Sequence, residues 1–164
     1  MENYIVINGK KEELTEEQLE KLGIKVKKDP FERVGHNGFY WRITTQGVAD
    51  TKREVWKEAN QKQYDVANYC TDKELIEQRA LHETLNRLLW RYSMQHGGDK
   101  IDWEDREAKH WYVLWDYEDR RFDVYKNEVL RTQGAVYFLT QNTAYNAIEE
   151  IAKPFMGQHP EFKW

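Results

Sequence analysis

The stretch "ANYCTDKELIEQRA" at residues 67–80 has a counterpart in "AVYFLTQNTAYNAI" at residues 135–148. Each stretch has an alanine, a tyrosine two residues later, and then a threonine suited to begin a helix. At the first site Thr71 is followed three residues later by Glu74, and this spacing is typical of a capping box that closes the first helical turn. We therefore predict that a β-strand ends and a capped helix begins at both places, with Thr71 and Thr140 as the caps.

Two explanations for this echo stay open. In one, the chain contains an internal duplication. In the other, the common motif of a strand followed by a capped helix arose twice independently, because both helices must close one sheet. Tyr69 and Tyr137 are 68 positions apart, whereas the two caps are 69 apart, so an alignment needs a one-residue insertion. Both explanations predict an α+β fold, an antiparallel sheet with two main helices packed on it, as a loose tandem of two strand–strand–helix units.

Residues 1–30 are predicted to form a small N-terminal element. Its run "YIVI" predicts a strand, and the Asn8–Gly9 pair that follows is a strong signal for a tight turn. Thr15 and Gln18 have the spacing of another capping box, and Gly23 supplies the residue that ends the helix. The element is therefore expected to be a short strand followed by a short capped helix.

Residues 31–98 are predicted to form the first strand–strand–helix unit. A turn at "HNG" separates a short strand from "FYWRITT", which is rich in β-forming residues. "VADTKREVW" is expected to be the next strand, and the polar "KEANQKQ" (57–63) is expected to be a loop. The following helix has apolar residues at helical spacing and stops at "HGG"; they are Leu81, Leu85, Leu88, Leu89 and Tyr92.

Residues 99–164 are predicted to repeat this plan, so that the three parts form one compact domain. "HWYVLWDYEDRRFDVYKN" predicts two strands joined by a turn near Glu118–Asp119. Both strands are apolar on both faces, which is typical of a sheet covered on both sides. "AVYFL" predicts a further strand, and the helix that begins at Thr140 is expected to end at Pro154.

Composition limits the classes of function. The 164 residues have 25 basic and 29 acidic side chains, a net charge of −4, and no apolar run near the ~20 residues of a membrane span. The charge disfavours both nonspecific nucleic-acid binding and a mimic of nucleic acid, and the lack of a long apolar run predicts no membrane partner. A single cysteine and no signal-peptide pattern at the N-terminus predict a cytoplasmic protein. Seven Trp and ten Tyr are many for this length, and such residues build both cores and interface hot spots.

The sequence is similar to small uncharacterised proteins of bacteriophages and prophages from Gram-positive hosts. The shared residues are Phe31, Arg33, Val34, Tyr40, Ile43, Asn68, Tyr69 and Thr71. Cys70 and Ala67 stand where those proteins usually have Phe and Gly. The resemblance implies a mobile-element accessory protein, and by association one that inhibits a host defence. It brings no catalytic residues with it.

The sequence lacks the residues that most catalytic mechanisms require. His82–Glu83 begins an H-E-x-x-H pattern, but Asn86 stands at the second histidine position. There is no glycine-rich phosphate loop, and Ser93 is the only serine. Cys70 follows an apolar run, which indicates a packing residue rather than a nucleophile. We therefore predict no catalytic residues, no metal and no cofactor.

The interpretation that this leaves is a phage-encoded inhibitor of a bacterial defence system, such as a CRISPR effector, that acts by stoichiometric protein binding. Its candidate partner-binding residues are Trp41, Arg42, Trp90, Arg91, Trp103, Asp116, Glu118 and Asp119. An alternative is a module that sequesters a signalling nucleotide, because Trp–Arg neighbours suit base stacking and phosphate binding. A third is a carboxylate- and Mg²⁺-dependent nuclease at the acidic turn. The identity of the partner and the oligomeric state stay open.

Overall fold

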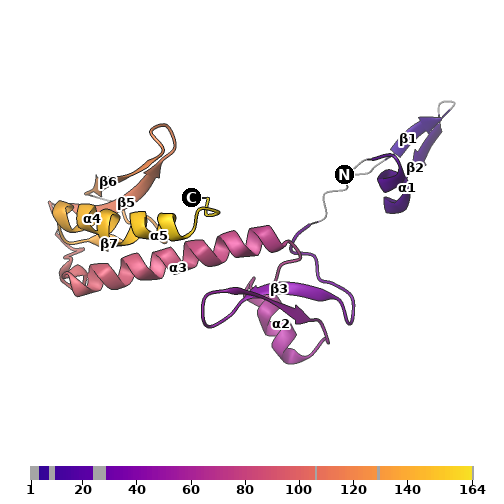
Figure 1. The fold of residues 1–164 in the computed structure, drawn as a ribbon, viewed down its shortest axis with the longest axis horizontal. Coiled ribbons are helices and arrows are strands. Elements are labelled where there is room, and N and C mark those ends of the chain that lie inside the picture. Colours follow the sequence, from indigo (N-terminus) through magenta and orange to yellow (C-terminus); the bar gives the residue numbers. More distant parts are fainter. Residues whose placement is uncertain (1–3, 8–9, 24–28, 106, 129, 164) are drawn as a thin grey trace.

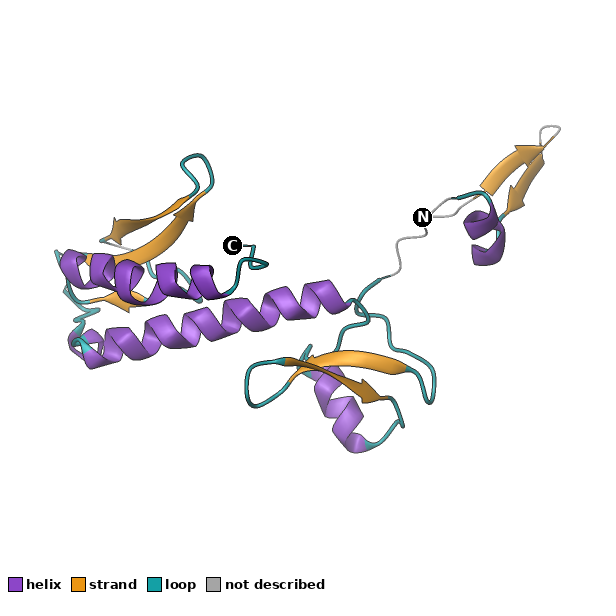
Figure 2. Cartoon of the chain, viewed as in Figure 1, coloured by secondary structure: helices purple, strands orange, loops and turns teal. Residues whose placement is uncertain are grey.

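The computed structural model describes residues 4–7, 10–23, 29–105, 107–128 and 130–163. Within them the predicted α+β class is confirmed, with helices and antiparallel strands in each part (Figures 1 and 2). The described strands form three separate small sheets, of order β1-β2, β3-β4 and β6-β5-β7. The expectation that both main helices close one shared sheet is therefore wrong.

The N-terminal element is a hairpin followed by a helix. Strand β1 (Tyr4–Ile7) and helix α1 (Glu16–Lys21) confirm the predicted strand and helix. The capping box is also confirmed, since Thr15 N donates to Gln18 Oε1 at 2.8 Å and Gln18 N donates to Thr15 Oγ1 at 3.3 Å. Strand β2 (Lys10–Glu13) was not predicted, because its charged sequence has no strand propensity and it forms by pairing with β1. The predicted turn at Asn8–Gly9 lies outside the described residues.

In the first unit, strands β3 (Phe39–Ile43) and β4 (Ala49–Arg53) form the predicted hairpin. The polar segment after it is not a loop but helix α2 (Glu58–Asp65). Asn60 explains the difference, because it is buried and its Nδ2 donates to the Tyr40 hydroxyl at 3.0 Å and to the Arg53 carbonyl at 3.1 Å. A polar anchor of this kind gives no apolar periodicity to the sequence. The short strand predicted before the "HNG" turn does not form.

Helix α3 (Lys73–Gln95) begins one residue later than predicted. Its N-cap is Asp72, whose Oδ1 accepts a hydrogen bond from Leu75 N at 3.1 Å. Thr71 is held elsewhere, since its Oγ1 donates to the Pro30 carbonyl at 3.1 Å. The predicted capping box of Thr71 and Glu74 is therefore wrong.

Helix α3 belongs to two hydrophobic cores. Near its N-terminus Ile76 and Ala80 pack with Ile43 and Cys70 of the first unit. Farther along the helix, Leu85, Leu89 and Tyr92 pack against the second unit. Figure 1 shows α3 as a long helix with the β3–β4 hairpin near its N-terminal end and the second unit along the rest.

The second unit contains the turn η1 (Gly98–Lys100) and strands β5 (His110–Asp116), β6 (Arg121–Asn127) and β7 (Tyr137–Phe138). The predicted hairpin and short strand are confirmed. One face of the sheet packs into the core through Trp111, Val113, Phe122 and Val124. On the other face Leu114 and Tyr125 are 39% and 42% exposed, so the prediction that both faces are covered is wrong.

The last helix begins as predicted but does not end at Pro154. It runs through α4 (Gln141–Ala147), the π-helical segment η2 (Ile148–Ala152) and α5 (Lys153–Gln158). Thr140 is its cap, accepting a hydrogen bond from Thr143 N at 3.1 Å. Proline cannot donate a backbone hydrogen bond and crowds the carbonyl four residues before it. The wider turn of the π-helix ends two residues before the proline and contains the residue four positions before it, which explains how the helix continues past it.

The two sequence echoes form equivalent structures. Cys70 forms a β-bridge with Trp41, and Phe138 pairs in the same antiparallel sense with Trp111. The hydroxyl of Tyr69 accepts a hydrogen bond from Val34 N at 3.0 Å, and that of Tyr137 accepts one from Thr132 N at 2.7 Å. Each returning segment therefore closes the edge of its own hairpin before a capped helix begins. None of the described helices has the length and apolar character that a membrane crossing requires.

Candidate partner-binding site

A fully buried carboxylate organises the surface of the first unit. Glu54 follows β4 and has no exposed area. Arg33 Nε donates to its Oε2 at 3.0 Å, and the backbone N–H of Trp56 donates to its Oε1 at 2.7 Å. Burial raises the pKa of Glu54, but these hydrogen bonds outweigh burial and hold that pKa below its usual value. The carboxylate is therefore charged at neutral pH and ties the segment after β4 to the core.

The hydrogen bond to Glu54 holds Trp56 in an unusual backbone conformation. Trp56 has φ +52°, in the left-handed region that residues with a Cβ rarely adopt. Its indole is nonetheless directed to solvent, with 62% of the residue exposed. The ring of His36 meets it edge to face, with centroids 5.5 Å apart. A strained backbone thus presents a large aromatic side chain on the surface.

A second exposed aromatic residue, Phe39, begins the strand that follows His36. Residues 36–38 run antiparallel to the segment that follows β4, since Asn37 N donates to Glu54 O and Glu54 N donates to Gly38 O, each at 2.8 Å. Phe39, the next residue, is exposed, and the Arg53 guanidinium lies 5.2 Å from its ring centroid. Arg53 forms no ion pair with any described residue. We call His36, Phe39, Arg53 and Trp56 the Trp56 surface.

The structure separates the predicted neighbours Trp41 and Arg42. Adjacent residues on a strand point to opposite faces, and Trp41 packs beside the core shared with α3 while Lys73 Nζ lies 5.5 Å from its ring centroid. Arg42 lies opposite Asp50, 3.8 Å away between Nη2 and Oδ2. The pair therefore does not meet around one ligand, whereas Trp41 shares the Phe39 side of the hairpin.

Trp90 lies on α3 and is 58% exposed, and its neighbour Arg91 is exposed too. The helical position of Trp90, outside the apolar stripe, predicts that it meets another element or a partner. In the structure Trp90 is not buried against another element. Arg91 makes no ion pair within the part of the chain that the structure describes.

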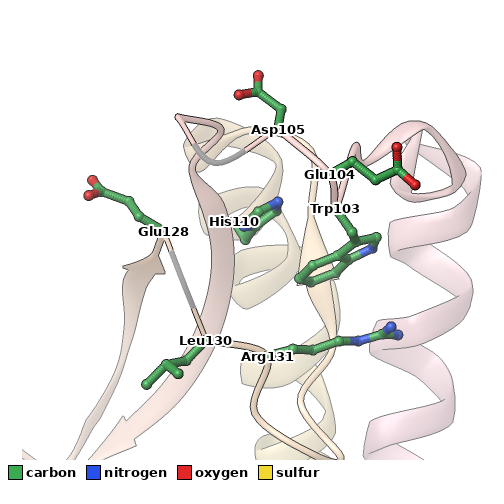
Figure 3. Close-up of a pocket in the computed structure, with 7 residues that line it drawn as sticks. All are labelled: Trp103, Glu104, Asp105, His110, Glu128, Leu130 and Arg131. Carbon is green, nitrogen blue, oxygen red and sulfur yellow. The ribbon is translucent and has the colours of Figure 1, made fainter.

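Trp103 lines a pocket in the second unit (Figure 3). It stacks on His110 with centroids 4.3 Å apart, and the guanidinium of Arg131 lies 4.6 Å from its ring centroid. In Figure 3 the imidazole and the guanidinium lie on opposite sides of the indole. Glu104 and Asp105 line the same pocket, whose volume is about 670 Å³. The faces of the indole are thus occupied by the protein's own side chains, and the residue remains 39% exposed.

The predicted carboxylates stabilise a hairpin turn. Asp116 Oδ1 accepts hydrogen bonds from the backbone N–H groups of Glu118 and Asp119, at 2.9 and 3.0 Å. Asp119 also pairs with Arg121 at 2.9 Å. Among the described residues, no group of three or more His, Cys, Asp or Glu side chains is placed to hold a metal ion. The geometry gives the nuclease alternative no support.

The sequence predicted none of the four residues of the Trp56 surface. Trp56 was placed in a predicted strand, although β4 ends at Arg53. Its exposure depends on Arg33 and Glu54, which are 21 positions apart in the chain and give no local signal. An Arg–Glu contact of this kind is visible only in three dimensions. No protein-family model matches the chain, and no curated protein or solved structure matches it significantly either.

Proposed function

We propose that this protein is a non-enzymatic binding protein that docks on a partner protein through the Trp56 surface. The observation that carries the proposal is that Trp56 is 62% exposed while its backbone is held at φ +52°. Its backbone N–H donates to the buried Glu54 carboxylate and holds it there. Strained backbone of this kind costs roughly 1–3 kcal/mol and is concentrated at functional sites. An exposed side chain that is held at such a cost is best explained by a binding role.

The composition of the surface fits a protein interface. Tryptophan and arginine are the residues most enriched among interface hot spots, and here Trp56 is exposed while Arg53 lies over the ring of the exposed Phe39. The ion pair of the partly exposed Arg33 with the buried Glu54 fixes the backbone beneath them. Little conformational entropy would therefore be lost when a partner binds. A partner surface with an apolar pocket and a neighbouring carboxylate would complement the Trp56 indole and the Arg53 guanidinium.

The resemblance to phage and prophage proteins suggests the setting. We infer that the partner belongs to a bacterial defence system, such as a CRISPR effector, and that binding blocks it at one inhibitor per site. This proposal uses no catalytic residue.

Inhibition assays with purified CRISPR effectors test the proposal. We expect one effector to lose target cleavage as the protein is added, with the loss complete near one equivalent. Trp56→Ala should abolish this inhibition, whereas Trp90→Ala should retain it, because Trp90 is equally exposed but lies on α3. If the two variants behave the other way round, the docking site is on α3. If no effector in the panel is affected at large excess, the proposed setting is wrong.

A further inference from the structure

A second pocket lies between the tip of the β5–β6 hairpin and the last helix. Trp115 and Phe122 line it from the two strands, and Ile148 and Met156 line it from η2 and α5. Its volume is about 560 Å³, within the range of small-molecule sites, roughly 300–1,000 Å³. Trp115 and Phe122 meet edge to face with centroids 5.0 Å apart. The apolar side chains thus form an aromatic wall on the strand side and a largely aliphatic wall on the helix side. Tyr145 also lines the pocket on the helix side, and Asp123 and Glu149 add two carboxylates.

The charges around this pocket leave one cation without a partner among the described residues. Three basic residues line it, Arg120, Arg121 and Lys153. Arg121 lies 2.9 Å from Asp119 and 3.9 Å from Asp123, and Lys153 lies 2.5 Å from Glu149. Arg120 forms no ion pair or hydrogen bond with any described residue. It is therefore the one lining cation that is available to an acidic group.

The backbone at both sides of the pocket departs from regular geometry. Arg120 has φ +51°, the left-handed conformation, at the end of the hairpin loop. On the opposite side, Ile148 and Glu149 begin the π-helical segment η2, and π-helical turns occur frequently at functional sites. Two unusual backbone segments thus face each other across the pocket.

We propose that this pocket binds a small amphipathic anion, a molecule with an aromatic or aliphatic body and a single acidic group. The body packs between Trp115 and Phe122 on one side and Ile148 and Met156 on the other, and the acidic group pairs with Arg120. A single acidic group is specified because the other two cations are already paired. A neutral molecule would leave Arg120 without a partner.

A pair of fluorescent probes tests this assignment. The anionic probe is 8-anilino-1-naphthalenesulfonate, and N-phenyl-1-naphthylamine has nearly the same rings without the sulfonate. We expect the anion to bind the native protein at one site and the neutral probe to bind more weakly. In ¹⁵N-labelled protein, the amide shifts caused by the anion should cluster at residues 115, 120–123 and 145–156.

Substitution separates the role of the charge from that of the apolar walls. Arg120→Gln should weaken anion binding about tenfold or more, the loss expected for one charge-assisted hydrogen bond, and leave binding of the neutral probe unchanged. Arg91→Gln removes an arginine on α3 that likewise makes no ion pair with a described residue. It should leave the binding of both probes unchanged, and so should Trp56→Ala at the proposed docking surface. Thermal unfolding of each variant confirms that it is folded. The assignment is overturned if neither probe binds, if shifts scatter over the surface, or if Arg120→Gln binds the anion as tightly as the unaltered protein.

Discussion

Arg33 and Glu54, 21 residues apart in the sequence, form an ion pair in which Nε lies 3.0 Å from a carboxylate oxygen that is entirely buried. The same carboxylate accepts the backbone N–H of Trp56 at 2.7 Å. Removing one partner of such a pair leaves polar groups without hydrogen bonds in a dry site. The pair therefore links the stability of the first unit to the placement of its most exposed tryptophan.

Acidification should lower the free energy of unfolding, because it protonates the Glu54 carboxylate. Its pKa is held below the usual value in the folded protein, so its contribution to stability is present above the pKa of the unfolded chain, about 4.3, and is lost as pH falls through the folded pKa. We expect Glu54→Gln to lower the free energy of unfolding by roughly 1.5–3 kcal/mol at pH 7. In urea unfolding from pH 7 to pH 3, this difference should shrink with acidification. Glu58→Gln, in an exposed pair with Lys62, should show no such pH dependence.

Glycine substitution tests whether the backbone at Trp56 is strained. Trp56→Gly and Trp56→Ala both remove the indole, but only glycine adopts φ +52° without strain. We expect the glycine variant to be more stable than the alanine variant by roughly 0.5–1 kcal/mol. The same two substitutions at Trp90, inside helix α3, should show the opposite order by about 1 kcal/mol. Denaturant unfolding of the four variants decides this, and an alanine variant at least as stable at Trp56 would mean that the site is unstrained.

Alanine substitution at Asp72, the N-cap of α3, should destabilise the protein more than alanine substitution at Thr71. Asp72 Oδ1 accepts Leu75 N at 3.1 Å, and replacing such a cap by alanine costs about 0.5–2 kcal/mol. Thr71 contacts only the Pro30 carbonyl through its hydroxyl, so Thr71→Ala should cost about 0.5 kcal/mol. Thermal unfolding of the two variants measures the difference. A larger loss for Thr71→Ala would place the cap where the capping-box pattern predicts it.

The elements that the sequence predicted correctly are those with complete local signals. Thr15 and Gln18 satisfy each other within one helical turn, and Thr140 needs only Thr143. The β5–β6 hairpin has alternating apolar residues and a turn stabilised by Asp116, all close in the chain. Where a helix or hairpin is stabilised by residues close to it in the chain, the sequence pattern is enough to predict that element.

The elements that were missed take their stability from distant residues. Helix α2 is anchored by Asn60 on Tyr40, 20 positions earlier, and no apolar period marks it. At the start of α3, Thr71 and Asp72 are both good N-cap residues by type. Asp72 becomes the cap because the Thr71 hydroxyl is already hydrogen-bonded to the Pro30 carbonyl. The Trp56 surface depends on Arg33 and Glu54 in the same way. Tertiary contacts of this kind have no counterpart in local propensity.

Cys70 should be chemically inert and hard to enlarge. It is fully buried opposite Trp41, and burial raises the pKa of its thiol. Because the thiolate is the reactive form, Ellman's reagent should modify Cys70 only slowly at pH 7, with the rate rising sharply as urea unfolds the chain. If the thiol reacts at once in the native protein, Cys70 is accessible and its assignment as a packing residue is wrong.

The equivalent of Cys70 in the second unit is Phe138, opposite Trp111. Cys70→Phe places that larger ring beside Ile76 and Ala80, which are already packed. This substitution should lower the free energy of unfolding by about 1–3 kcal/mol.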